Sequence, residues 1–164
     1  VLTEGVGQRL VARVVVGEVL DGVPQAAVFG HMDDLVDLVD EARLAAASAR
    51  VAKALAISLA DPRGQWLLGP KQGARNEYRL TAMIAGERRN LVMDRTFVDA
   101  DGKRWIVDYK TSSHEGTDIE GFLDREQERY RVQLERYAQA LAHAEPTMRG
   151  LYFPLLAGWR EWSG

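Results

Sequence analysis

The spacing of apolar and polar residues predicts helices in the first part of the chain and strands after it. Apolar side chains at mixed spacing over roughly residues 4–19 fit a first helix that is rich in valine. An alanine-rich segment over roughly residues 32–60 repeats its apolar positions at helical spacing and predicts a second helix. We expect Asp61, Pro62 and Gly64 to end that helix, because proline and glycine interrupt helices.

From residue 75 onward the period of the pattern changes from helical to two. Apolar side chains at every second position predict a half-buried strand, with Tyr78, Leu80, Ala82 and Ile84 on one face. A turn at residues 86–87 leads to a second strand over 89–98, and a turn at 99–102 leads to a third over 104–110. The segment therefore predicts three antiparallel strands joined by two hairpins.

One more helix and one more strand follow. A polar loop over residues 111–117 precedes a long amphipathic helix at roughly residues 119–143. Pro146 separates this helix from an apolar strand near residues 151–155. Two helices, three meandering strands, a helix and a final strand predict an α/β fold, with a mixed sheet flanked by helices.

Composition narrows the class of protein. The chain has 164 residues and is 46% hydrophobic, which is enough for one core, so we expect a single domain over residues 1–164. It has no run of about 20 apolar residues and no secretory signal pattern, so we expect a soluble protein with no membrane partner. The absence of cysteine excludes disulfides, thiolate metal sites and cysteine nucleophiles, and we expect a cytoplasmic location. Because the chain begins at Val1, we also expect it to be part of a larger polypeptide.

Two aspartates and a lysine interrupt the apolar strands. Asp94 follows three apolar residues, and Asp108 and Lys110 lie near the end of the next strand. Side chains alternate along a strand, so Asp108 and Lys110 share a face, and the hairpin can bring Asp94 beside them. Neighbouring carboxylates repel unless a cation lies between them, and oxygen ligands suit Mg²⁺ or Mn²⁺. The backbone carbonyl of Tyr109 is a further candidate ligand.

This arrangement predicts a site for phosphodiester hydrolysis, in which Lys110 orients water or neutralises charge on the phosphate. The alternative is an exposed Asp-x-Lys ion pair at the end of a strand, which occurs by chance. On the later helix, Gln133 and Tyr137 are four residues apart and share a face, close to Tyr130 and Arg131. For the tyrosines, packing on the sheet is an equally good interpretation.

Three segments in order carry a resemblance to a known family: Leu91-Val92-Met93-Asp94, Ile106-Val107-Asp108-Tyr109-Lys110-Thr111 and Tyr130-Arg131-Val132-Gln133-Leu134-Glu135-Arg136-Tyr137. They resemble the motifs of the PD-(D/E)XK nuclease domain at the C-terminal end of RecB/AddA-type helicase-nucleases, such as the exodeoxyribonuclease V beta chain. The resemblance extends over roughly residues 77–153. It implies a restriction-endonuclease-like core, with a central mixed β-sheet flanked by helices.

The resemblance also implies roles for individual residues. Asp94 and Asp108 would bind Mg²⁺, Lys110 would be catalytic, and the helix with Gln133 and Tyr137 would contact the site and DNA. Arg131 lies in the same motif and is a candidate for DNA binding or for support of the site.

Two upstream positions are compared with the family in the same way. The family commonly has a metal-binding histidine on its first helix, but the segment Gly5-Val6-Gly7-Gln8-Arg9 has none. His31 lies in a different sequence context, and we expect it to be a surface or helix-start residue. Glu77 lies where some relatives carry an acid, and an exposed strand glutamate is the alternative.

The leading hypothesis is a metal-dependent deoxyribonuclease of DNA recombination and repair that acts on single strands leaving a helicase motor. Its expected partners are DNA, the helicase portion of the same polypeptide and possible further subunits of a recombination complex. A set of arginines could follow the phosphates: Arg75, Arg79, Arg88, Arg89, Arg95 and Arg131. The alternative is a catalytically silent domain for DNA binding or intramolecular docking. The sequence does not separate DNA from RNA as substrate.

Overall fold

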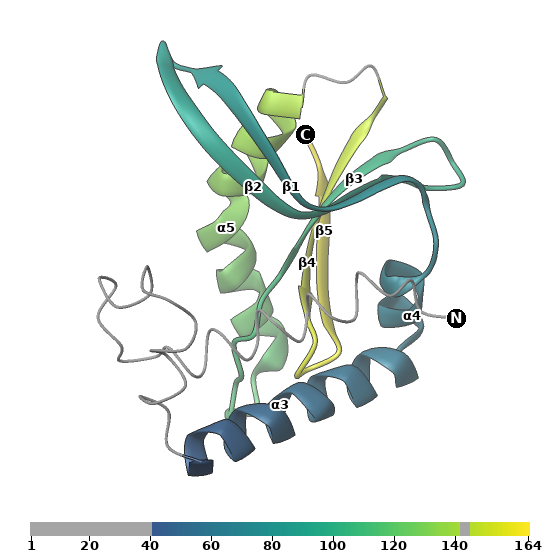
Figure 1. Ribbon diagram of the computed structural model, residues 1–164, viewed down its shortest axis with the longest axis vertical. Helices are drawn as coiled ribbons and strands as arrows, with labels where there is room; N and C mark the ends of the chain where they lie inside the picture. The colour runs from purple at the N-terminus through teal and green to yellow at the C-terminus, as the bar shows by residue number, and fades with distance from the viewer. Residues whose placement is uncertain (1–40, 142–144) are drawn as a thin grey trace.

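The fold is a five-stranded mixed sheet with helices on both faces, as a computed structural model describes it for residues 41–141 and 145–164 (Figure 1). The strands follow chain order across the sheet: β1 (Gln72–Ile84), β2 (Glu87–Val98), β3 (Arg104–Tyr109), β4 (Thr147–Phe153) and β5 (Gly158–Ser163). The described helices are α3 (Glu41–Ala60), α4 (Pro62–Leu68) and α5 (Ile119–Leu141). Among the described strands only β3 and β4 pair in parallel, because α5 lies between them in the chain and carries it back across the sheet.

The alternating side chains of β3 separate two layers of core. Val107 packs with Leu67 of α4 on one face of the sheet, while Ile106 packs with Tyr137 of α5 on the other. A further cluster joins α5 to β4 through Leu134 and other buried side chains. The sheet is therefore covered by α5 on one face and by α3 and α4 on the other (Figure 1). No helix in the described ranges is long and apolar enough to cross a membrane.

The hairpin of β1 and β2 is longer than the rest of the sheet. Only residues 95–98 of β2 pair with β3, whereas β2 pairs with β1 along almost its whole length. The outer part of the hairpin therefore extends beyond the sheet as an arm (Figure 1). Met93 attaches the base of this arm to α5 by packing with Tyr78 and Tyr137.

The predicted α/β class and the three-stranded meander are confirmed. The predicted helix end at Ala60 is confirmed, but the sequence pattern did not indicate α4, which begins at Pro62. Asp61 caps α4 by accepting hydrogen bonds from the N–H groups of Arg63 and Gly64, and Pro62 occupies its first turn. The residues expected to stop one helix therefore start another.

The boundaries of the later elements also differ from the prediction. The strand expected near residues 151–155 is β4, which begins earlier and ends at Phe153. The sequence pattern did not indicate β5, which pairs antiparallel with β4. The first expected helix, residues 32–40 of the second and His143 lie outside the described residues, as do Gly5 to Arg9 and His31.

Candidate active site

The pairing of β2 with β3 brings the two strand aspartates together. Arg95 pairs with Val107, so one step further along the antiparallel register Asp94 lies opposite Asp108, on the same face of the sheet. Asp94 is 8% exposed and Asp108 is 2% exposed. The backbone N–H of Tyr109 donates a hydrogen bond of 2.9 Å to Asp94 Oδ2. The site thus contains two buried, adjacent carboxylates.

Lys110 extends from the end of β3 into the same site. Its Nζ lies 2.6 Å from Asp108 Oδ2 and 3.4 Å from the centroid of the Tyr130 ring. The side chain is only 11% exposed. Its backbone N–H donates to the carbonyl of Tyr152 in β4, which fixes the chain where β3 ends. The ammonium is therefore held between a carboxylate and the face of an aromatic ring.

Helix α5 supplies the polar groups above Asp108. Gln133 Nε2 donates to Asp108 Oδ1 at 3.5 Å and to the Tyr137 hydroxyl at 2.9 Å. Both side chains come from one face of α5, as their four-residue spacing predicts. The structure therefore brings together Asp94, Asp108, Lys110, Gln133 and Tyr137, as expected from the sequence.

The oxygen donors of this site fit a small divalent cation. Asp108 Oδ2 is buried and accepts no hydrogen bond within the described part of the chain, so Lys110 pairs with it as a charge rather than as an aligned donor. No group of three or more His, Asp or Glu side chains gathers for a metal within the described residues. Two carboxylates nevertheless suit Mg²⁺, which is usually held by one or two carboxylates and keeps several waters. The Tyr109 carbonyl stays a predicted ligand.

Glu126 is a buried acid that sequence reasoning missed. It is 7% exposed, lies one turn before Tyr130 on α5, and its Oε2 has no hydrogen-bond partner among the described residues. Its other oxygen accepts from Arg129. The signal was present in the sequence, because Glu126 falls in the apolar stripe that includes Leu123 and Leu134.

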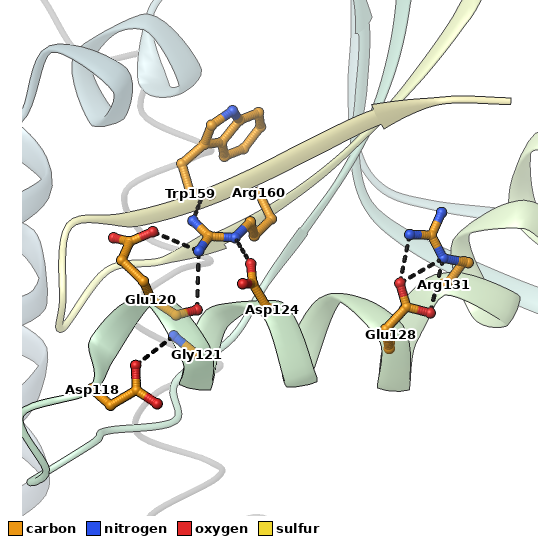
Figure 2. Close-up of polar contacts among 8 residues, drawn as sticks. All are labelled: Asp118, Glu120, Gly121, Asp124, Glu128, Arg131, Trp159 and Arg160. Carbon is orange, nitrogen blue, oxygen red and sulfur yellow. Dashed lines mark hydrogen bonds and ion pairs between the residues drawn. The ribbon is translucent and has the colours of Figure 1, made fainter.

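The side chain of Arg131 contacts groups other than the candidate site residues. Its guanidinium pairs with Glu128 at 2.7 Å, as Figure 2 shows, and lies over the Trp162 ring. The hydrogen bonds that Arg131 donates to Glu128 raise the pKa of Arg131, against a smaller opposing effect of burial. These contacts give Arg131 a role in joining α5 to β5, and its predicted contact with DNA remains a prediction.

Two other predicted positions lie along β1 and β2. Arg95 is buried, 1% exposed, and donates to Asn76 Oδ1 and to the carbonyl of Gly69. Burial lowers its pKa, and its place in the interior excludes it from a phosphate-following surface. Glu77 is exposed and lies across from Asp94, between two registered pairs of β1 and β2, with a left-handed φ of 46°. Its role as a site acid remains a prediction.

Comparison with known proteins agrees with this geometry. Residues 40–157, well over half of the chain, match the PD-(D/E)XK nuclease superfamily. The chain belongs to this superfamily. Its members are generally nucleases, and the matched segment contains both site aspartates and Lys110. None of the curated proteins searched matches the chain.

Proposed function

We propose that this PD-(D/E)XK domain hydrolyses phosphodiester bonds in DNA with the help of Mg²⁺, or of Mn²⁺. The observation that carries the proposal is the pair of facing buried carboxylates, Asp94 and Asp108, with the ammonium of Lys110 against one of them. Burying two carboxylates together costs free energy of folding, which a purely structural role does not explain. The same pair is suited to holding a cation.

Each residue has a defined part in this proposal. Asp94 and Asp108 would hold the metal, and the N–H of Tyr109 fixes the orientation of the Asp94 carboxylate by a hydrogen bond. A bound divalent ion polarises the scissile phosphate and lowers the pKa of coordinated water. Lys110 is placed to donate hydrogen bonds to the attacking water or to the phosphate oxygens, and its positive charge offsets the charge that develops there. Gln133 positions Asp108.

The finer assignment rests on the order of the motifs. We propose that the domain is of the RecB/AddA type, the C-terminal part of a helicase-nuclease that acts in recombination and repair. In that setting it would cut single-stranded DNA delivered by the motor, in the cytoplasm, alongside the helicase portion and further subunits. Its formal charge of -3 fits an enzyme that receives its strand from a neighbour, because the domain has no overall positive field of its own.

A catalytically silent nuclease-like domain is the second candidate. One observation favours it: Lys110 lies 2.6 Å from Asp108 Oδ2 and already compensates the charge of that carboxylate. A site that is neutralised by its own lysine can persist without a metal and serve only DNA binding or docking.

Degradation of labelled single-stranded DNA in Mg²⁺ or Mn²⁺ tests the proposal. We expect cleavage by the wild type, none with chelator, and loss of cleavage in Asp108→Ala and Lys110→Ala. Asp101→Ala and Lys103→Ala are matched controls, because they remove the same charges from the exposed turn at the other end of β3. Retained cleavage in Asp108→Ala would refute the assigned site. A wild type that neither cuts DNA nor binds metal by calorimetry would favour the silent domain.

A further inference from the structure

A hollow lies beside the loop that follows Lys110. It has a volume of about 420 Å³ and is lined by three segments: α3, the loop that follows Lys110, and the turn between β4 and β5. The lining residues are Ala49, Arg50, Lys53, Ser113, His114, Glu115, Leu155 and Leu156. Figure 1 shows the loop after β3 passing near α3 before the chain enters α5. We call this hollow the α3 pocket.

The α3 pocket carries two cations on one helical face. Arg50 and Lys53 are three residues apart on α3, so their side chains project in similar directions. Arg50 donates a hydrogen bond of 2.8 Å to the carbonyl of Thr111, which ties α3 to the residue directly after Lys110. Lys53 is exposed and makes no hydrogen bond or ion pair among the described residues. No described side chain therefore neutralises the charge of Lys53.

The wall of the pocket opposite α3 is held in place by α5. The His114 ring stacks on Phe122 with centroids 4.8 Å apart and an interplanar angle of 11°. The Nε2 edge of His114 is covered by Gly116, where an added Cβ would lie 2.6 Å away. Since both of its sides are anchored to helices, the pocket is formed before a ligand arrives.

The α3 pocket lies within reach of a nucleic acid strand bound at the candidate active site. Ser113 is three residues from Lys110, which corresponds to at most about 11 Å along an extended chain. A stacked strand advances about 3.4 Å per nucleotide, so the two places are separated by about three nucleotides or fewer. Leu155 and Leu156 add an apolar side to which a sugar or a base can pack.

From these observations we infer that the α3 pocket binds a backbone phosphate of the same DNA strand that is cut, within about three nucleotides of the scissile phosphate. The binding groups are Arg50, Lys53 and the Ser113 hydroxyl. This inference rests on the proposed action on DNA and adds a binding subsite to it. Glu115 also lines the pocket, and its carboxylate opposes the binding of a phosphate. Removal of the Lys53 charge should therefore weaken DNA binding, and removal of the Glu115 charge should strengthen it.

Binding of a fluorescent oligothymidylate, followed by anisotropy at several salt concentrations, tests the subsite. Ca²⁺ replaces Mg²⁺ so that a cation occupies the carboxylates of the candidate active site. A gel of the same sample confirms that the strand has not been cut. For Lys53→Gln we expect affinity to fall about threefold or more, and the slope of log affinity against log salt to become shallower by about 0.7. Glu115→Gln should bind more tightly. Lys103→Gln, at the opposite end of β3, is the matched control.

A strand with one uncharged methylphosphonate linkage, moved along its length, locates the contact. At one position we expect the uncharged linkage to weaken binding by the wild type but not by Lys53→Gln. The uncharged linkage and the substitution would each remove the same contact between Lys53 and a phosphate. Equal affinities for Lys53→Gln and Lys103→Gln, or no tightening in Glu115→Gln, would overturn the subsite even if the domain cuts DNA. Conversely, the wild type could bind DNA more tightly than Lys53→Gln and yet cut no DNA. That result would support the subsite and refute only the nuclease proposal.

Discussion

Lys110 is held in the candidate active site by a carboxylate and an aromatic ring, and the ring offers a test of how far catalysis depends on the position of the ammonium. We expect Tyr130→Leu to lower kcat about tenfold, because a partly buried contact between a cation and a ring is worth about 1–2 kcal/mol. Tyr130→Phe keeps the ring face and should remain close to wild type. Steady-state cleavage rates measure both variants. Equal losses would show that the hydroxyl matters instead.

In the proposed mechanism Gln133 is a positioning residue, because its amide contacts the side chains of Asp108 and Tyr137. Removal of a group that orients a metal ligand typically costs about tenfold to a hundredfold in metal affinity or activity. We therefore expect Gln133→Ala to raise the Mg²⁺ concentration needed for the half-maximal rate. Tyr137→Phe should cause a smaller rise, because it removes only the hydroxyl that accepts from the amide.

The control for this pair is Gln139→Ala, which removes an exposed glutamine from another part of α5. A metal titration of the cleavage rate distinguishes the variants. If Gln133→Ala lowers kcat without changing the metal dependence, the amide acts on the substrate and not on Asp108.

The convergence of Asp94, Asp108 and Lys110 could be predicted because it depends only on two rules, alternation along a strand and pairing across a hairpin. The contact of Tyr130 with Lys110 was not predicted. It depends on how α5 is rotated against the sheet, which a single sequence pattern does not specify. The burial of Glu126, by contrast, could have been predicted, because this residue falls in the apolar stripe of α5.

Among the elements, the turn between β2 and β3 depends on one side chain. Asp99 accepts from the backbone N–H groups of Asp101 and Lys103 and from the Trp105 indole at 2.7 Å. Although burial opposes it, these hydrogen bonds together lower the pKa of Asp99. A lowered folded-state pKa contributes stability above the ordinary aspartate value of about 3.9. That contribution is lost as the pH falls through the folded-state pKa.

We therefore expect Asp99→Asn to lower the free energy of unfolding at pH 7, and the difference from wild type to shrink as the pH falls below about 4. Urea unfolding at a series of pH values measures this difference. Asp101→Asn, on the same turn, is the matched control. A difference that does not vary with pH would show that the Asp99 carboxylate contributes through geometry alone.

The elements that the sequence pattern missed have identifiable reasons. Asp61 followed by Pro62 fits both a helix end and a capped helix start, and only the position of the next segment decides between them. Strand β5 follows a turn in which Ala157, rather than glycine, adopts a positive φ of 49°. Because Leu155 and Leu156 in this turn continue the apolar run of β4, the pattern predicts a longer strand there instead of a hairpin.

In the molecule as a whole, α5 joins the site to the far edge of the sheet. Arg160 of β5 binds Asp124 at 2.7 Å and Glu120 at 2.6 Å, both on the first turns of α5 (Figure 2). The same helix supplies Gln133 and Tyr130 to the candidate active site further along. The positions of Gln133 and Tyr130 are thus set by how the whole helix lies on the sheet, and binding at the site should stabilise the entire domain.

Thermal unfolding with and without Mg²⁺ tests this coupling. A ligand that binds only the folded state stabilises it by RT ln(1 + [L]/Kd), which is about 2.7 kcal/mol at a hundredfold excess over Kd. Since one kcal/mol shifts the midpoint by about 2–4 °C in a domain of this size, we expect a readily measured rise. The rise should disappear in Asp108→Asn and persist in Asp101→Asn. An equal rise in both variants would place the cation outside the pair of Asp94 and Asp108.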